Sequence, residues 1–140
     1  MTGNGTAARG ESTVVVCLDD EPQILSALRR LLRNEPYDFL STERPDEALA
    51  WVVDRRAALV IADQRMPGIS GLEVLETVRL CSPETVRVLL TAQSDLTEVL
   101  QVRGIDAIDR LVRKPWDGEE LKKLLRLLLV QRPAPRGRPG

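Results

Sequence analysis

Length, composition and charge limit the classes of protein to which this chain can belong. It has 140 residues, of which 43% are hydrophobic and 29% are charged, and its formal net charge is -1. These values fit one globular domain with short tails. The near-balance of charge argues against direct binding of nucleic acid, and aromatic residues make up only 3% of the chain, too few for a stacking platform.

Several further classes are disfavoured by what the sequence lacks. No apolar run approaches the roughly 18 residues that span a membrane, and the N-terminus has no signal-peptide core. There is no histidine, which excludes His-based zinc sites and Ser-His or Cys-His dyads. Cys17 and Cys81 have no C-x-x-C spacing and are typical of reduced thiols. We therefore expect a cytoplasmic protein without membrane contact.

The two ends of the chain differ in composition from its middle. Residues 1–13 are rich in Gly, Thr and Ala without periodicity, and residues 131–140 hold three prolines among three arginines. Such segments bury little apolar surface, so a disordered leader and a disordered tail or linker stub are predicted. Residues 14–130 are then the single folded domain.

The first part of this domain alternates strands with helices. The continuous apolar run at 14–18 is typical of a strand buried on both faces. Pro22 suits the first turn of a helix whose apolar positions within 24–32 lie on one face. Residues 37–42 form a more polar strand, suited to a sheet edge, and Pro45 begins the next helix.

The middle of the domain repeats this alternation. A third strand is predicted at 59–62, and it ends at Asp63. After a loop rich in Pro and Gly, Ser70 is placed to cap a helix. A fourth strand is predicted at 86–90, and it ends at Thr91.

The last part contains a weaker helix, a short strand and a strong helix. The helix expected at 94–103 is stopped by Gly104, and a strand follows at 111–113. Asp117 and Glu120 form the D-x-x-E pattern of a capping box before a leucine-rich helix. Five strands alternating with five helices predict a doubly wound α/β domain, with a mostly parallel sheet and helices on both faces.

Polar side chains follow four of the five predicted strands. In an open α/β sheet, ligands bind beyond the carboxyl ends of the strands, where the strand order reverses. Those ends carry Asp19, Asp20, Asp63, Thr91 and Lys114. The strand that lacks such a group is the second, which lies farthest from the cleft in a 2-1-3-4-5 order.

The residue types at these ends suit phosphoryl transfer. Neighbouring strands lie about 4.8 Å apart, so Asp19, Asp20 and Asp63 should crowd together and repel unless a cation joins them. Oxygen ligands of this kind suit Mg²⁺. The stem of Lys114 can span much of the roughly 10 Å that separates it from Asp63. With the Thr91 hydroxyl, the set comprises a carboxylate nucleophile, a metal, a cation and a donor.

Four stretches resemble the receiver domain of bacterial two-component response regulators. They are residues 16–22 (VCLDDEP), 63–71 (DQRMPGISG), 90–92 (LTA) and 114–116 (KPW). The resemblance extends over about 14–130 and implies a flavodoxin-like five-stranded sheet. It also implies a phosphorylation switch, not an enzyme acting on other substrates.

The resemblance implies a role for each matching residue. Asp63 is the phosphoacceptor. It also binds Mg²⁺ directly, as do Asp20 and the backbone carbonyl of Arg65, whereas Asp19 holds the ion through water. Lys114 contacts the phosphoryl group and precedes a cis peptide bond at Pro115.

The resemblance also implies movement and partners. Thr91 moves toward the phosphoryl group and draws the helix expected at 94–103 with it. The implied partners are a sensor histidine kinase and a downstream effector protein. The face formed by that helix, the strand at 111–113 and the last helix is a candidate dimer interface.

Two positions depart from the family pattern. Leu111 stands where many members have an aromatic residue that moves with the threonine, so this coupling must be altered or absent. Arg65 has a guanidinium at a position that often governs the rate of dephosphorylation. Its side chain either stabilises the phosphoryl group or faces solvent, and the sequence leaves both alternatives open.

Each of the polar residues at the strand ends also has a simpler interpretation. Taken singly, Asp63 is a turn former, Asp19 a helix cap, Thr91 a loop hydroxyl and Lys114 a solvated charge. An adaptor of receiver fold that is never phosphorylated is one alternative function. A phosphohydrolase with an aspartyl-phosphate intermediate is another, but such enzymes of the haloacid-dehalogenase type have D-x-D on their first strand. The common edge of the polar residues favours the switch.

Overall fold

The computed structural model describes residues 13–101 and 103–131, which include nearly all of the predicted domain. Most of the predicted leader and tail lies outside these residues. Thr13 lies inside them, and its carbonyl accepts a hydrogen bond from the Asp38 amide at 2.8 Å. Gln131 is the last residue of the final helix.

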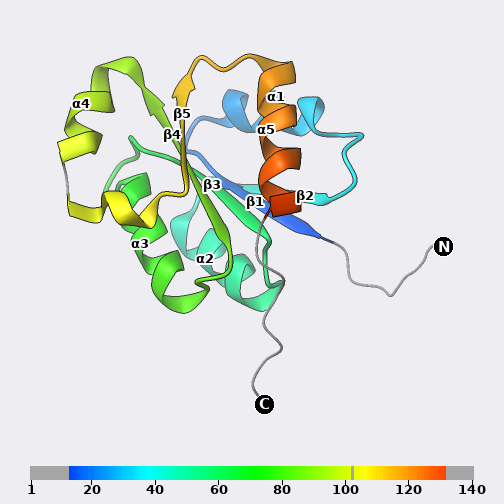
Figure 1. Ribbon diagram of the computed structural model, residues 1–140, viewed down its shortest axis with the longest axis horizontal. Helices are drawn as coiled ribbons and strands as arrows, with labels where there is room; N and C mark the ends of the chain where they lie inside the picture. Colours follow the sequence, from blue (N-terminus) through cyan, green and yellow to red (C-terminus); the bar gives the residue numbers. More distant parts are fainter. Residues whose placement is uncertain (1–12, 102, 132–140) are drawn as a thin grey trace.

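Five parallel strands form one sheet in the order β2-β1-β3-β4-β5 (Figure 1). Their bounds are β1 Val14–Leu18, β2 Asp38–Thr42, β3 Leu59–Asp63, β4 Val86–Ala92 and β5 Arg110–Lys114. The predicted fold class and strand order are confirmed. The polar second strand is at an edge, as its composition indicated.

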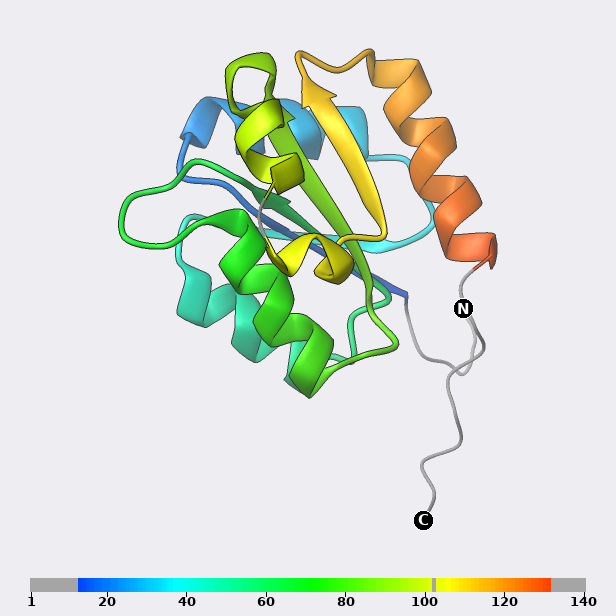
Figure 2. The ribbon, with the colours of Figure 1, turned by 60° about the vertical axis from the view of Figure 1, so that its left-hand side comes forward.

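Helices cover both faces of the sheet. They are α1 Pro22–Leu31, α2 Pro45–Asp54, α3 Gly71–Cys81, α4 Gln93–Gln101 and α5 Gly118–Gln131, with a 3-10 segment η1 at Arg103–Ala107. Helices α1 and α5 pack on one face, and α2, α3 and α4 on the other (Figure 2). In the part of the chain that the structure describes, no helix is long and apolar enough to cross a membrane.

The core follows the alternation of side chains along the buried strands. In β1, Val15 and Cys17 face α1 and α5, while Val14, Val16 and Leu18 face α2 and α3. All five residues of β1 and all five of β3 are buried. A continuous apolar run was therefore the correct signature of a strand with helices on both sides.

The helix starts agree with the capping patterns of the sequence. The Ser70 hydroxyl accepts a hydrogen bond from the Glu73 amide at 3.1 Å, and the Glu73 carboxylate accepts one from the Ser70 amide at 2.8 Å. Asp117 accepts a hydrogen bond from the Glu120 amide at 3.0 Å, which is one of the two contacts of the capping box predicted there. These contacts satisfy amides that have no partner within the helix.

The region after α4 differs from the sequence prediction. Helix α4 ends at Gln101 instead of continuing to residue 103, and Gly104 lies inside η1 instead of ending an α-helix. The end of η1 contacts a buried arginine of β4 whose role the sequence did not reveal. Arg87 donates to the Ala107 carbonyl at 2.9 Å and to the Pro83 carbonyl at 3.2 Å, which fixes the end of η1 against the sheet.

Gly71, the first residue of α3, packs where no side chain fits. A methyl group there would lie 2.4 Å from the backbone oxygen of Asp63 and 2.8 Å from a methyl carbon of Leu89. Gly118, the first residue of α5, offers a matched comparison, because its nearest neighbour is the flexible Leu31 side chain at 3.0 Å.

Gly71→Ala should lower the free energy of unfolding by about 2 kcal/mol, since the added carbon forces the backbone of β3 and α3 apart. Gly118→Ala should stay within about 1 kcal/mol of the unmodified protein, because the better helix propensity of alanine offsets the crowding. Chemical denaturation of the two variants measures both values. Equal losses would contradict the close approach of α3 to Asp63.

Candidate functional site

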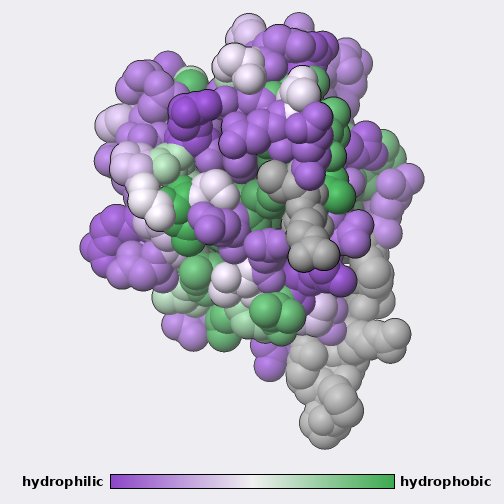
Figure 3. Space-filling model, turned by 90° about the vertical axis from the view of Figure 1, so that its left-hand side faces the viewer, coloured by the Kyte–Doolittle hydropathy of each residue, from purple (hydrophilic) through white to green (hydrophobic). Residues whose placement is uncertain are grey.

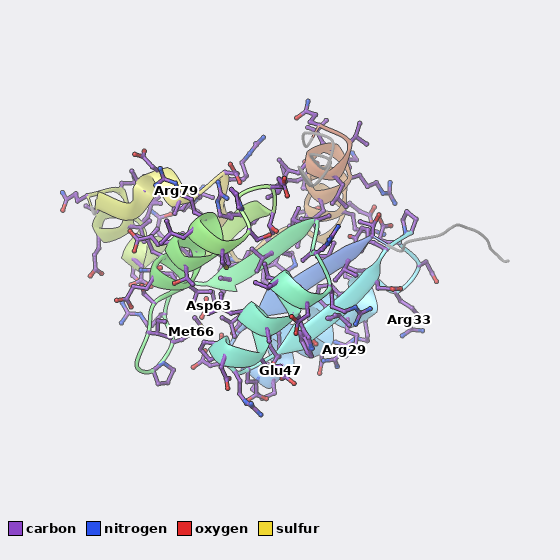
Figure 4. All side chains as sticks on the ribbon, turned by 90° about the horizontal axis from the view of Figure 1, so that it is seen from below. Arg29, Arg33, Glu47, Asp63, Met66 and Arg79 are labelled. Atoms are coloured by element: carbon purple, nitrogen blue, oxygen red, sulfur yellow. The ribbon has the colours of Figure 1, made fainter. Side chains whose placement is uncertain are left out.

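Three carboxylates meet at the carboxyl edge of the sheet. Asp19 and Asp20 directly follow β1, and Asp63 is the last residue of β3. One carboxylate oxygen of each lies within 4.8 Å of the others. Asp19 and Asp63 are almost fully buried, with 0% and 4% of their surface exposed. Figure 4 shows Asp63 near the loop that carries Met66.

Lys114 supplies the positive charge at this edge. It is the last residue of β5, and its Nζ lies 2.6 Å from Oδ1 of Asp63 and 3.5 Å from Oδ2 of Asp19. The Lys114–Pro115 peptide bond is cis, as the family resemblance implied. The same nitrogen lies 3.5 Å from Glu21, a neighbour that sequence reasoning missed although it directly follows Asp20.

The electrostatics of the cluster are dominated by burial. Loss of water raises the pKa of Asp19 to about 6, opposed by a hydrogen bond from the Glu21 amide and reinforced by the charge of Asp63. Burial also raises the pKa of Asp63, although Lys114 acts in the opposite direction. For Lys114, burial lowers the pKa, but the hydrogen bond with Asp63 and the carboxylate of Asp19 outweigh it, so the pKa is raised.

Asp19 also has a local structural role. Its Oδ1 accepts a hydrogen bond at 2.9 Å from the amide of Glu21, the residue that precedes α1. The carboxylate therefore orders the turn between β1 and α1 while its second oxygen faces Lys114. Asp19 is therefore not the cap of α1, whose N-cap residue is Glu21, and its contact in the preceding turn is compatible with its place in the acidic cluster.

Thr91 is at the predicted edge but is not joined to the cluster by a hydrogen bond. It is fully buried in β4, and its hydroxyl donates to the carbonyl of the next residue, Ala92, at 3.3 Å. Ala92 is the register partner of Lys114, so Thr91 lies one row before the lysine. The structure thus brings together the three aspartates and Lys114, while the threonine hydroxyl is engaged by its own backbone.

The Arg65 side chain is largely exposed to solvent, one of the two alternatives that the sequence left open, but it also has a partner that the sequence did not indicate. Its guanidinium forms a bidentate ion pair with Asp95 of α4, with Nε 3.2 Å from Oδ2 and a terminal nitrogen on Oδ1. The Asp95 side chain is 5% exposed and that of Arg65 is 74% exposed. No local pattern announces this pair, because its members are 30 positions apart.

Leu111 sits beside this region without a polar contact. It lies in β5 opposite Leu89 of β4, and it packs, half-buried, against the core between the sheet and α2, α3 and α4. An aliphatic side chain packed in this way has no ring or hydroxyl that could follow Thr91 in the movement that the family resemblance implies.

The donor set of the cluster suits a hard divalent cation. All three candidate ligands are carboxylates, and oxygen ligands are those that Mg²⁺ prefers. A single lysine cannot neutralise three converging carboxylates. A second cation bound among them would therefore be electrostatically favourable. The acidic pocket therefore fits the metal that the sequence led us to expect.

Comparison with known proteins gives one family. The sequence model for "Response regulator receiver domain" matches residues 15–126. A hydrogenase transcriptional regulatory protein, HoxA of Cupriavidus necator, is 34% identical over 79% of this chain and 23% of its own length. The probable transcriptional regulatory protein TcrX of Mycobacterium tuberculosis is 32% identical over 87% of this chain and 52% of its own length.

Solved structures agree with this relationship. The response regulator TrrA of Thermotoga maritima, in a complex with Mg²⁺ and BeF, is 33% identical, with a TM-score of 0.73 over 83% of this chain and 98% of that one. The signal receiver domain of an HD domain-containing protein of Pseudomonas fluorescens is 30% identical, with a TM-score of 0.78 over 86% of this chain and 89% of that one.

The relatives are longer than this chain. It covers between 22% and 52% of the curated relatives named HoxA, YkoG and TcrX, which are described as transcriptional regulatory proteins. Their shared part is the domain whose fold and acidic edge are described above. The chain therefore belongs to the response-regulator receiver domains of two-component systems.

Proposed function

We propose that this domain is a phosphorylation switch in which Asp63 accepts a phosphoryl group from a sensor histidine kinase or a small acyl phosphate. The observation that supports this most is the contact of Asp63 with Lys114 at 2.6 Å, beside the carboxylates of Asp19 and Asp20. A buried carboxylate with a cation on one side and further acids on the other is arranged to receive a charged group.

The transfer itself is a displacement at phosphorus. An oxygen of Asp63 forms a bond to phosphorus as the bond from phosphorus to the donor breaks. With a phosphohistidine donor, the electron pair of the P–N bond returns to the imidazole. Position and charge neutralisation supply most of the catalysis in such reactions, so the protein mainly needs to hold its groups in place.

The acidic pocket would hold Mg²⁺ through Asp19, Asp20, Asp63 and the backbone carbonyl of Arg65. When bound, the ion neutralises negative charge on the phosphoryl oxygens. The protein's own contribution is Lys114, which keeps its proton because the carboxylates around it raise its pKa. Its ammonium can move from the Asp63 carboxylate to a phosphoryl oxygen at the same position.

The response is proposed to be read by an effector protein at the face formed by α4, β5 and α5, which is also the candidate dimer interface. A groove of about 650 Å³ opens on this face, lined by Gln93, Val112, Trp116, Leu121, Leu124 and neighbouring residues. Its lining combines apolar and aromatic side chains with polar ones, which suits a protein partner. We propose that the partner, like this domain, is cytoplasmic.

Asp63→Asn should abolish phosphorylation, because an amide lacks the nucleophilic oxygen charge. The protein is mixed with acetyl phosphate and Mg²⁺, and intact mass spectrometry measures the increment of one phosphoryl group. Asp54→Asn, which changes an exposed aspartate at the end of α2, is the matched control and should keep the full increment. An equal increment on Asp63→Asn would contradict the assignment. A chain that gains no phosphoryl group would be an adaptor, and turnover of a phosphoester would favour the hydrolase.

Mg²⁺ should stabilise the protein through the acidic pocket. At a concentration about ten times its dissociation constant, a ligand of the folded state adds about 1.4 kcal/mol to the free energy of unfolding. Chemical denaturation with and without MgCl₂ measures this gain, which Asp20→Asn should largely lose and Asp54→Asn should keep. If Asp20→Asn shows the same gain as the unmodified protein, the ion binds elsewhere.

A further inference from the structure

The ion pair between Arg65 and Asp95 joins the phosphorylation loop to α4. Arg65 lies two positions after Asp63 in the loop between β3 and α3, and Asp95 is the third residue of α4. Both carboxylate oxygens of Asp95 contact the guanidinium. Bidentate pairs of this kind are among the stronger polar contacts in proteins. The contact is therefore the direct polar link between the residue to be modified and α4.

Apart from this link and a hydrogen bond from Arg113 of β5 to the exposed side chain of Gln93, α4 is attached by little apolar packing. Only Asp95 and Val99 of this helix are buried, and Leu100 is 58% exposed. Helix α3, in contrast, buries five of its residues. Figure 3, which faces the side of the molecule where α3 and α4 lie in Figure 1, shows a mostly hydrophilic surface with separate small hydrophobic areas. Little apolar burial therefore opposes movement of α4.

The two ends of this segment are held by different arginines. Beyond the C-terminal end of α4, the carbonyl of Ala107 in η1 is fixed by the buried Arg87. At the N-terminal end two arginines contact side chains of α4: Arg65 binds Asp95, and Arg113 of β5 donates to the side-chain oxygen of Gln93. Of the two, Arg65 belongs to the loop that follows Asp63, and its side chain is largely exposed. The start of α4 is thus the end that can be released, while η1 stays on the sheet.

We propose that Asp95 is a positioning residue that holds Arg65 on α4 until Asp63 is phosphorylated, and that phosphorylation then draws Arg65 away and frees the start of α4. This inference rests on the proposed phosphorylation of Asp63. A phosphoryl group carries close to two negative charges and several acceptor oxygens, and guanidinium binds such groups well. It would arise two residues from Arg65, in the same loop.

Departure of Arg65 leaves the buried Asp95 carboxylate without its cation. The contact that ties the first turn of α4 to the loop of Arg65 is then lost. Because Asp95 belongs to that turn, the start of α4 becomes free to shift. The Arg65–Asp95 pair would also let phosphorylation of Asp63 move α4 although Leu111 has no aromatic ring that could couple to Thr91.

Hydrogen exchange of α4 amides tests the proposal in two variants. Arg65→Gln removes the guanidinium at an exposed position, and Asp95→Asn removes the buried charge while keeping its shape. Before phosphorylation, α4 peptides should exchange about tenfold faster in both variants than in the unmodified protein, as expected for loss of a charge-assisted contact. Arg44→Gln, which breaks the exposed pair with Asp46, is the matched control and should leave α4 unchanged.

Phosphorylation supplies the decisive comparison. With acetyl phosphate and Mg²⁺, exchange in α4 of the unmodified protein should rise by about tenfold, and in both variants it should change by less than about threefold. A merely stabilising ion pair would instead give the same phosphorylation response in all three proteins, which would overturn the proposal. Slower exchange on phosphorylation would also overturn it, because Arg65 would then bridge Asp95 and the phosphoryl group.

The test separates this inference from the function on which it rests. Intact mass measured on the same samples reports whether Asp63 was modified. Absence of the increment in the unmodified protein would contradict the proposed function. Even then, α4 exchange before phosphorylation tests whether the Arg65–Asp95 pair holds this helix. Equal exchange in the unmodified protein and both variants would overturn the positioning role of Asp95.

Discussion

Negative charge gathered at the carboxyl edge of the sheet is the constraint on which the rest of the structure depends. Asp19 and Asp63 are nearly inaccessible to water, and burial raises the pKa of both. Such an arrangement costs stability unless cations offset it, and Lys114 is the nearest described cation. The fully buried strands β1 and β3 hold the acids there, because their apolar side chains fix where each strand ends. The core thus holds together groups that repel one another.

The same constraint relates rigid and movable parts of the domain. Gly71 lets α3 approach the backbone of Asp63 closely, so the proposed phosphoacceptor is supported on that side by packed backbone. A phosphoryl charge on Asp63 would meet no loosely packed element in that direction. The lightly packed parts lie across the edge, in the loop of Arg65 and in α4, whose buried residues are few. We therefore expect a change in charge at Asp63 to move the segments with the least apolar packing.

Sequence patterns predicted whatever depends on local periodicity or on strand ends. The apolar run of β1, the helix cap at Ser70 and the convergence of three aspartates all follow from spacing along the chain. Patterns could not predict contacts between side chains distant in sequence. The pairing of Arg65 with Asp95 is such a contact, and the hydrogen bond from Arg87 to the backbone carbonyl of Ala107 is equally non-local. Each depends on how loops lie across the finished sheet, which no spacing rule encodes.

The residues of the acidic cluster follow the pattern of the receiver family. The residues that depart from that pattern indicate what is particular to this chain. Leu111 packs with the core and offers no polar group, so the link between Thr91 and the surface must be weaker than one built on an aromatic residue. Arg65 has a partner on α4 that no motif requires. A switch needs two arrangements that differ by only a few kcal/mol, and an ion pair with one buried and one exposed member suits that need. The buried member makes separation costly, while the exposed member makes an exchange of partners sterically easy.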